Sequence, residues 1–383
     1  MIIPIAPADI DGLRVILRHG GLRIVHQEAK RLRASRVLLI AGGSATAHGD
    51  TVAGLLGDRL AGRVTEVAQH VPADVAERAV KLAVEVRADL VVTIGGGSAT
   101  GLGKAVARET GLRILAVPTT FSGSEATPIW GLTEDGRKTT GRDPRVRPTT
   151  VIYDPELFAT LPPDLVATSA LNAFAHCVEG LYAPDATRGT TEWATDGIDL
   201  LTKGLDMIGH PMTGRRLDAA ASRRLRTGED AAAAVRLHLL LGGFHAGLVL
   251  GATTMGIHHK LAHVLGGTYR LPHAATHAVL LPQVVAANAT AAPDAMARAA
   301  KAMGLRKGDR DVAGGIWHLA RGSGAPTSLA ELGWSSDAVD DVIDAVLAAP
   351  PANPYPVERH WLRTLLLAAH RGELSDPART MPG

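Results

Sequence analysis

The chain carries a dense group of histidines between residues 256 and 277, where five of its sixteen histidines occur. Histidine can donate, accept or ligate near neutral pH, so such a group is a candidate for proton transfer or metal binding. His259 and His263 stand four residues apart and share one face if this stretch is helical. We expect the Gly-Gly pair and the proline that follow to end that helix and turn the chain back, so that His273 reaches the same place. A purely hydrogen-bonded role is commoner for any single histidine, and the clustering favours a site.

A glycine-rich loop follows a predicted buried strand at residues 90–94 and opens a predicted helix. Free backbone N–H groups at a helix N-terminus attract phosphate. The loop matches neither common fingerprint, because Thr100 occupies the third glycine position of Gly-x-Gly-x-x-Gly and Ala105 stands where a P-loop has Ser or Thr. A tight turn without a ligand is the alternative. Two threonines follow the next strand at the same sheet edge, so the predicted nucleotide-binding residues are Gly95, Gly96, Gly97, Ser98, Thr119 and Thr120.

The elements that would position these groups change character near residue 160. Before it, β-branched runs alternate with helical spacing; the predicted strands are 36–41, 90–94, 115–118 and 150–153, and a helix is predicted over 73–87. This pattern predicts an α/β N-terminal domain over residues 1–160, Rossmann-like with a parallel sheet. From Pro163 onward the spacing is almost entirely helical. Residues 161–383 are therefore predicted to form an all-α C-terminal domain that carries the histidine cluster.

Composition excludes several classes of protein. Forty basic and 38 acidic residues give a net charge of +2, so no nucleic-acid partner is expected, and the arginine-rich stretches 31–36 and 215–226 are interpreted as solvated helix faces. The single cysteine, Cys177, excludes a disulfide framework and fits a reducing cytoplasm. No signal peptide is recognised, and the apolar run 237–255 is interpreted as a buried helix pair. We expect a cytoplasmic protein without a membrane partner.

Several motifs resemble the iron-containing alcohol dehydrogenase superfamily: the Gly-Gly-Gly-Ser loop with its lysine, the Pro-Thr-Thr segment after the following strand, and the His-x-x-x-His array followed by Pro-His. Within the superfamily the chain is most similar to maleylacetate reductases, in residues 98–104, 123–133, 138–143, 171–179 and 271–278. The resemblance runs from about Val71 to Arg371, and Leu17–Leu22 replaces the Phe-Gly-x-Gly motif usual in the superfamily. It implies a dehydroquinate synthase-like α/β domain followed by a helical domain.

The resemblance also implies where a metal would be held in metal-dependent members. The four positions are Asn172, His176, His259 and His273. The first is an aspartate in those members, so this chain offers an amide and three neutral imidazoles, a weaker set for a dication than one with a carboxylate. Maleylacetate reductases share the asparagine and are regarded as metal-free. We therefore expect vestigial metal positions and no required metal.

The activity that the resemblance implies is reduction of the carbon–carbon double bond of maleylacetate or a similar unsaturated keto-acid to a 3-oxoadipate-type product, a step in aromatic compound degradation. The expected cofactor is NADH or NADPH, since no acid follows the first strand at Ala41–Ser44 to select the ribose. A developing enolate needs hydrogen-bond donors and a proton source. The candidate catalytic residues are His263, His259, His273 and His176. The candidate substrate-binding residues are Lys138, Arg142, Asn172 and His277, and a homodimer is expected.

Two other readings of the residues stay open. A metal-dependent alcohol dehydrogenase would act on a small alcohol or aldehyde, and Asn172 argues against it. The same architecture also supports a non-redox lyase or cyclase, or a pathway protein that binds a ligand without hydride transfer. Oxidation of NADH in the presence of maleylacetate or of simple aldehydes discriminates among the three.

Overall fold

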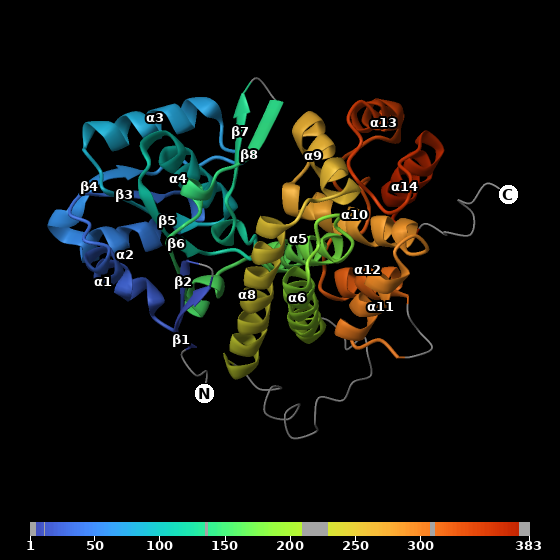
Figure 1. Cartoon of the computed structure of the whole chain (residues 1–383), viewed down its shortest axis with the longest axis horizontal. Coiled ribbons are helices and arrows are strands. Elements are labelled where there is room, and N and C mark those ends of the chain that lie inside the picture. The colour runs from blue at the N-terminus through green and yellow to red at the C-terminus, as the bar shows by residue number, and fades with distance from the viewer. Residues whose placement is uncertain (1–4, 11, 135–136, 209–228, 307–310, 375–383) are drawn as a thin grey trace. The chain divides into compact units, whose positions relative to one another are not determined.

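The computed structural model describes residues 5–10, 12–134, 137–208, 229–306 and 311–374. The chain divides into two compact units, Met1–Leu161 and Pro162–Gly383, and each is described by itself (Figure 1). The alternation of strands and helices ends where Pro163 opens α5 (Pro163–Leu181). Proline suits the first turn of a helix, because its missing N–H would have no partner there.

Unit 1 is built on a seven-stranded sheet in the order β1-β2-β9-β6-β5-β3-β4. The strands are β1 (Ile5–Ile10), β2 (Leu13–Leu17), β9 (Thr150–Tyr153), β6 (Arg113–Pro118), β5 (Leu90–Gly95), β3 (Val37–Ala41) and β4 (Leu60–Val64). All neighbours pair in parallel except β1, which pairs antiparallel with β2. The inner strands are covered on both faces, which accounts for their nearly continuous apolar sequences.

Helices cover both faces of this sheet. The helices α1 (Val25–Arg31) and α2 (Thr46–Leu56) pack together on one face, and α3 (Ala73–Glu85) and α4 (Gly97–Thr110) pack together on the other (Figure 1). Right-handed crossovers give this arrangement, because the chain moves outward from β3 to β4 and then returns to β5. The Rossmann-like α/β fold predicted from the sequence is confirmed.

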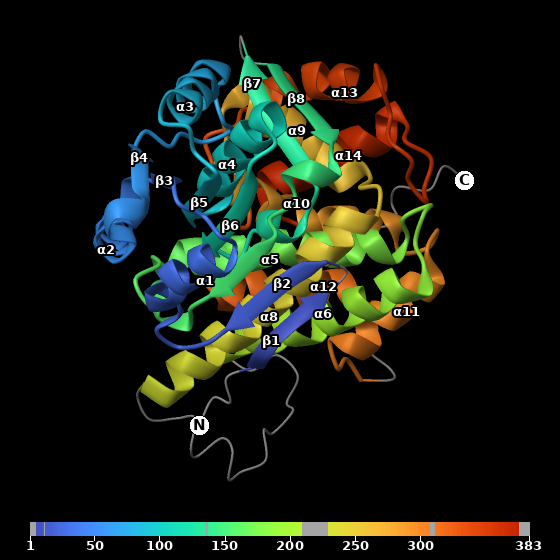
Figure 2. The same ribbon diagram turned by 60° about the vertical axis from the view of Figure 1, so that its left-hand side comes forward.

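The predicted strands and the predicted helix are present, with ends that differ by one or two residues. The sequence analysis missed β1, β2, β4 and the antiparallel hairpin of β7 (Ile129–Glu134) and β8 (Arg137–Arg142), which Figure 2 shows as a separate two-stranded ribbon. The edge strand β4 reads Leu-Ala-Gly-Arg-Val and is mostly half-buried. Such a strand lacks the apolar run that identifies a buried one.

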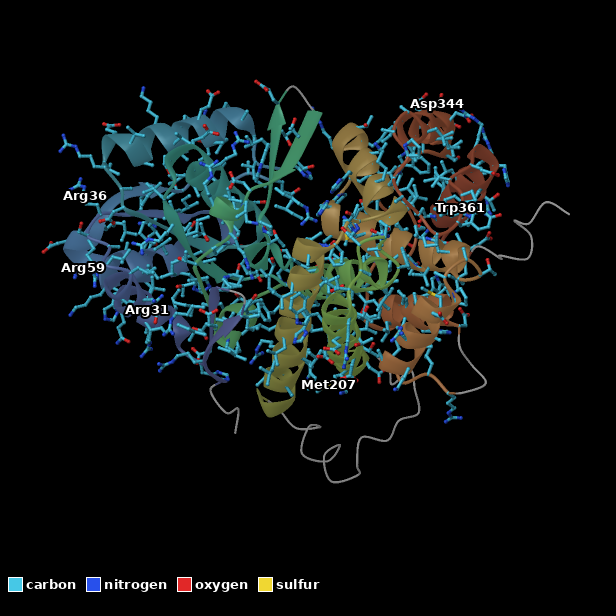
Figure 3. The ribbon with its side chains drawn as sticks, in the orientation of Figure 1. Arg31, Arg36, Arg59, Met207, Asp344 and Trp361 are labelled. Atoms are coloured by element: carbon cyan, nitrogen blue, oxygen red, sulfur yellow. The ribbon has the colours of Figure 1, made fainter. Side chains whose placement is uncertain are left out.

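The described part of unit 2 is helical. Its elements are α5, α6 (Arg188–Ile208), α8 (Glu229–Ala252), α9 (Ile257–Tyr269), α10 (His273–Asn288), α11 (Pro293–Ala302), α12 (Val312–Gly322), α13 (Val339–Leu347) and α14 (Arg359–Arg371). The helices α9, α10, α13 and α14 share one apolar core that contains the fully buried Trp361, labelled in Figure 3. This core fixes α9 and α10, which carry the histidines.

The prediction of a helix pair at residues 237–255 was wrong, because α8 is one continuous helix. Its glycines serve packing and do not break it: a Cβ atom at Gly242 would lie 2.6 Å from Leu201 Cγ on α6. By length and composition alone, Ala232–Ala252 could cross a membrane, but half of its most apolar window is buried within the protein. Because α8 packs against both α5 and α6, it is a core helix of this bundle.

The arginines of the stretch 31–36 are exposed, and two of them, Arg31 and Arg36, which Figure 3 labels, also form specific contacts. Arg31 pairs with Glu28 at 2.5 Å and donates to Thr150 Oγ1. Arg36 donates its backbone N–H to Asp89 and its Nε–H to the carbonyl of Val86. These arginines therefore tie helix ends to the sheet. The stretch 215–226 lies outside the described residues.

Candidate functional site

Two loops meet at the carboxyl ends of β5 and β6 in unit 1. Gly95 ends β5 with φ +144°, a conformation that L side chains rarely adopt, and α4 begins at Gly97. The N–H of Thr119 donates to Gly95 O at 3.0 Å. A Cβ atom at Gly96 would lie 2.9 Å from Thr120 Cγ2, so that glycine is needed for the loops to touch.

This arrangement leaves backbone N–H groups at the N-terminus of α4, in the setting where proteins bind phosphate. Gly96, Gly97, Ser98 and Thr120 are half-buried, whereas the Thr119 side chain is buried. The predicted nucleotide-binding residues therefore lie together at one sheet edge. Their role in cofactor binding stays a prediction.

A buried lysine links α4 to the segment that follows β6, and no role was predicted for it from the sequence. Lys104 on α4 is fully buried, and its Nζ donates to Ser124 O at 2.6 Å, Thr127 Oγ1 at 2.8 Å and Ile129 O at 2.7 Å. Burial lowers the pKa of Lys104 to about 7. Nearby, the Tyr153 hydroxyl donates to Glu125 Oε1 at 2.6 Å, and burial raises the pKa of Glu125.

The two candidate cations for the substrate carboxylates lie on β8 of unit 1. Arg142 is exposed and stands opposite Ile129 in the hairpin register. Lys138 stands opposite Thr133, and its side chain lies outside what the structure describes. The Arg108 guanidinium of α4 lies 4.1 Å from the centroid of the Trp130 ring, which ties the hairpin to α4.

In unit 2, three helices bring the histidines together. The helix α5 contributes Asn172, His176 and Glu179, whose spacings of four and three residues place them on one face. All three are buried. The helix α9 contributes His258, His259 and His263, and α10 contributes His273 and His277.

The turn between α9 and α10 differs from the one expected. The Gly-Gly pair at 266–267 lies inside α9, and the helix ends at Arg270, which has φ +56° in the left-handed region. Pro272 then precedes α10, so that His273 is the first residue of α10. The chain still turns back as the histidine pattern requires, but an arginine performs the role usually filled by glycine.

Ring contacts define the cluster. The His259 ring stacks on His176, with centroids 5.0 Å apart, and lies edge-on to His277 at 4.9 Å. The His277 ring also meets His273 edge-on at 4.5 Å. The exposed His263 lies farther out, 6.3 Å from His259 and 6.2 Å from the half-buried His273. The candidate catalytic histidines therefore form one continuous group, of which His263 is the exposed edge.

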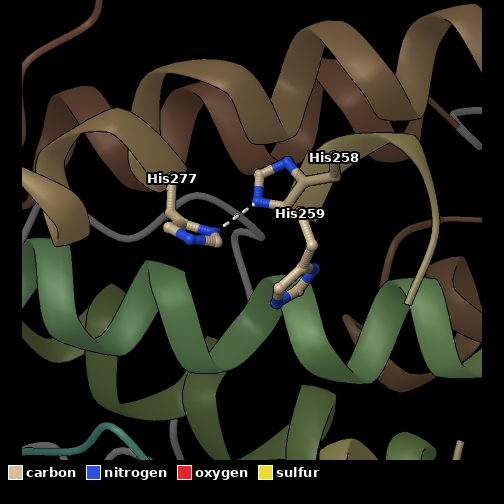
Figure 4. A group of neighbouring side chains, drawn as sticks. All are labelled: His258, His259 and His277. Carbon is tan, nitrogen blue, oxygen red and sulfur yellow. Dashed lines mark hydrogen bonds between the residues drawn. The ribbon is translucent and has the colours of Figure 1, made fainter. Parts of the chain in front are cut away.

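A buried carboxylate organises this group. Glu179 accepts from His259 Nδ1 at 2.5 Å, from the His258 backbone N–H at 2.9 Å and from the Gly256 backbone N–H at 3.1 Å. The last two N–H groups lie at the N-terminus of α9, where a negative charge is favoured. Because His259 Nδ1 faces a carboxylate, it carries a proton, and a neutral His259 then has its lone pair at Nε2. Figure 4 shows the His259 ring turned toward α5.

Neither Glu179 nor His258 was predicted from the sequence to belong to the site. His258 Nε2 lies 2.8 Å from His277 Nδ1, as the dashed line in Figure 4 shows. Burial, followed by the neighbouring histidines, places the pKa of His176, His258 and His277 well below the ordinary value. A signal was present for each residue: an acid in an otherwise apolar helix, and a second histidine adjacent to a candidate catalytic one.

Several buried polar atoms of the cluster have no hydrogen-bond partner among the described residues. They are Asn172 Oδ1, His176 Nδ1, His258 Nδ1, His259 Nε2 and His277 Nε2. Buried polar atoms are seldom left without partners, so we expect a ligand, an ion or water to bind to these atoms. Candidate metal-ligating nitrogens of His258, His259 and His277 also lie within 4.8 Å of one another.

The donor set fits a divalent ion in its chemistry. Imidazole nitrogens suit iron and zinc, and the Glu179 carboxylate orients His259 as the outer partner of a metal-bound histidine does. Asn172, His176, His259 and His273 would hold such an ion by the resemblance. Asn172 is neutral, so these four ligands carry no negative charge and would bind a dication more weakly than a set with a carboxylate.

Comparison with known proteins identifies the family. The model of the iron-containing alcohol dehydrogenases matches residues 13–155, and that of the C-terminal part of the same family matches residues 166–370. The chain is 41% identical over 359 residues to the maleylacetate reductase of Burkholderia cepacia, covering 94% of this chain and 96% of that protein. It is 42% identical over 364 residues to the maleylacetate reductase of Pseudomonas knackmussii, covering 95% and 97%.

Two solved structures support the same family assignment. The maleylacetate reductase of Agrobacterium tumefaciens superposes with a TM-score of 0.83 at 37% identity, covering 97% of this chain and 98% of that one. The enzyme of the same name from Rhizobium sp. strain MTP-10005 also gives a TM-score of 0.83 at 37% identity, covering 97% and 100%. The resemblance found in the motifs is confirmed, and the chain belongs to the iron-containing alcohol dehydrogenase family.

Proposed function

We propose that this NAD(P)H-dependent oxidoreductase reduces the carbon–carbon double bond of maleylacetate, or of a similar unsaturated keto-diacid, to a 3-oxoadipate-type product. The observation that carries the proposal is the sequence identity of this chain, about 40% over nearly its whole length, to several maleylacetate reductases. The histidine cluster supports it, because the reaction needs hydrogen-bond donors and a proton source.

The chemistry assigns separate tasks to the two units. Hydride from the nicotinamide adds to the alkene carbon farther from the ketone, and the electron pair moves onto the ketone oxygen to form an enolate. A proton then reaches the carbon next to the ketone. Unit 1 binds the nucleotide through the N-terminus of α4, and His263 and His273 of unit 2 donate to the enolate and supply the proton. His259, whose Nδ1–H is bonded to Glu179, accepts at Nε2 when it is neutral and donates there only when it is protonated. His176 stacks on His259 and limits its movement.

The two substrate carboxylates need donors of their own. Arg142 is the candidate for one of them, because its planar guanidinium matches a carboxylate, and Lys138 is the candidate for the other. Asn172 and His277 supply neutral polar groups from the buried part of the cluster. The atoms that no described residue pairs are His277 Nε2, which can donate, and Asn172 Oδ1, which only accepts.

We propose that this reaction requires no metal. A bound ion would act as a Lewis acid on the ketone oxygen, and donors from the histidines can stabilise the same charge. The neutral Asn172 supports the proposal, since its position holds an acid in the metal-dependent members that the motifs resemble. Retention of full activity after exhaustive chelation is expected.

Either NADH or NADPH is proposed as the reductant. A ribose-selecting acid was expected after the first strand predicted from the sequence, which is β3 of the structure, and this chain has Gly42 directly after it. A Cβ atom at Gly42 would lie 2.0 Å from Thr65 O, so a side chain there would collide with the backbone. No carboxylate at this position then repels a 2′-phosphate.

The proposal also includes a cytoplasmic location, a homodimer and a role in aromatic compound degradation. It includes no nucleic-acid partner and no membrane partner. A substrate comparison tests the activity: oxidation of NADH by the purified protein is followed at equal concentrations of maleylacetate and of simple aldehydes. We expect turnover with maleylacetate and little with aldehydes. Turnover with aldehydes alone, lost on chelation, would favour a metal-dependent alcohol dehydrogenase.

A further inference from the structure

Two buried histidines form a pair beside the candidate catalytic rings. His258 Nε2 on α9 and His277 Nδ1 on α10 lie 2.8 Å apart, and both residues are fully buried (Figure 4). Their outer nitrogens, His258 Nδ1 and His277 Nε2, are buried and have no partner among the described residues. His258 is not among the four positions assigned to a metal by the resemblance.

A count of protons constrains what the pair can do. Every imidazole carries at least one N–H, so a ring whose inner nitrogen accepts the shared hydrogen bond has its N–H on the outer nitrogen. Two neutral imidazoles carry two N–H groups in total. One of these fills the shared hydrogen bond, so the other sits on one of the two outer nitrogens. The pair therefore offers one donor and one acceptor, and the direction of the shared hydrogen bond decides which ring offers the donor.

The surroundings differ for the two rings. The His277 ring meets His273 edge-on at 4.5 Å and His259 at 4.9 Å, so it borders the proposed catalytic group. The His258 ring meets His259 edge-on at the longer distance of 5.4 Å, and His258 is anchored through its backbone N–H to Glu179. A keto-diacid and its enolate present oxygens that accept hydrogen bonds, and such oxygens favour an N–H on the ring that borders the site.

We propose that His258 is a positioning residue that donates Nε2–H to His277 Nδ1 and thereby keeps the remaining proton on His277 Nε2. His277 then presents a fixed donor to a carboxylate or enolate oxygen of the substrate. The proposal rests on the proposed function for the identity of that acceptor, whereas the direction of the hydrogen bond can be measured without substrate.

Two substitutions separate the hydrogen bond from the volume of the ring. His258→Leu fills the site with an apolar side chain and removes the donor, whereas His258→Gln places an amide N–H near the position of Nε2. We expect kcat with maleylacetate to fall about 10-fold to 100-fold in His258→Leu, the usual effect of losing the partner that orients a functional histidine. NADH affinity is expected to stay unchanged, and His258→Gln is expected to recover most of kcat.

A matched control is His238→Leu. His238 is half-buried on α8 and bonds through Nδ1 to Ala234 O of its own helix. That variant is expected to keep the wild-type kcat per folded molecule. Equal kcat per folded molecule in the wild type and His258→Leu, or no recovery in a folded His258→Gln protein, would overturn the proposal.

The tautomer itself is read by nitrogen NMR of chelator-treated protein labelled with ¹⁵N-histidine. The expected His277 signals show a lone pair at Nδ1 and a proton at Nε2, and His258→Leu is expected to change them. A proton on His277 Nδ1 in the wild type would contradict the proposal. Absence of NADH oxidation by the wild type would instead contradict the proposed function, so the two failures are distinguishable.

Discussion

At the scale of single residues, the candidate site depends on one buried acid among imidazoles and an amide. Glu179 is buried and accepts three N–H bonds, two from the start of α9 and one from His259. A carboxylate placed in this way fixes both the start of the helix and the orientation of the imidazole. Asn172, on the same face of α5, adds an amide at the position where the resemblance places an acid in the metal-dependent members.

Glu179→Gln should lower both turnover and stability. Glutamine keeps the shape of the side chain, but its NH₂ group must face at least one of the three N–H donors. We expect kcat to fall about 10-fold to 100-fold and the free energy of unfolding to fall by about 1–3 kcal/mol. Steady-state kinetics and urea unfolding measure the two effects. The control is Glu192→Gln, an exposed partner of Arg188 on α6, and an unchanged kcat in Glu179→Gln would refute the orienting role.

Asn172→Asp should convert the cluster into a stronger metal site. The substitution adds a negative charge to three imidazoles, and iron and zinc both bind more tightly to such a set. Competition with a chromophoric chelator measures the affinity for Zn²⁺, which we expect to rise by at least about 10-fold, on the scale that single ligand-sphere changes produce. Equal affinities of the two proteins would show that Asn172 lies outside any metal site.

At the scale of elements, the helices and strands that could be predicted from the sequence were those with a clear local pattern of apolar residues. The buried strands were found from their β-branched runs and α3 from its regular apolar spacing, whereas a helix at the position of α9 was considered because His259 and His263 stand four residues apart. The hairpin β7–β8 was not, since it is held by Arg108 over Trp130 and by pairing within the hairpin, and neither produces a local pattern. His258 and Glu179 acquire roles only through partners 19 and 80 residues away.

Gly97→Val should prevent nucleotide binding while leaving the fold intact. A Cβ atom at Gly97 would lie 3.3 Å from Ser122 Oγ, so a branched side chain crowds the two loops and blocks close approach of a pyrophosphate. Fluorescence titration with NADH is expected to show no saturable binding. Gly54→Val is the matched control, because nothing lies within 4 Å of its Cβ position on α2. NADH affinity equal to that of the wild type in Gly97→Val would rule out this placement of the cofactor.

Lys104 should make the stability of the protein depend on pH. Its pKa is about 7 in the folded protein and 10.5 ordinarily, so the unfolded chain binds more protons between these values. Stability therefore rises as the pH increases above 7, by up to about 1.4 kcal/mol per pH unit from this group. In urea unfolding followed by circular dichroism, Lys104→Met should show a smaller rise, whereas Lys203→Met, at an exposed pair with Asp199, should not. Identical slopes in Lys104→Met and the wild type would contradict this account.

At the scale of the whole molecule, the chain combines two units with different chemistry. Unit 1 supplies the glycine loop at its sheet edge, and unit 2 supplies the histidines around Glu179. The change from an alternating to a purely helical pattern made the fold class predictable, and the comparisons confirm the family. The convergence of His259, His263 and His273 was predicted, whereas the contacts of Glu179 and His258 were not, because they depend on how α5, α9 and α10 pack.

The central claim is that hydride goes to the carbon–carbon double bond and that no metal takes part. It is tested by a single turnover of chelator-treated protein with maleylacetate and NADH that carries deuterium at the transferable position, followed by NMR of the product. The account predicts a 3-oxoadipate-type product with deuterium on the carbon next to the distal carboxylate, two carbons from the ketone. Deuterium on a carbinol carbon, or no product until a divalent ion is added, would contradict it.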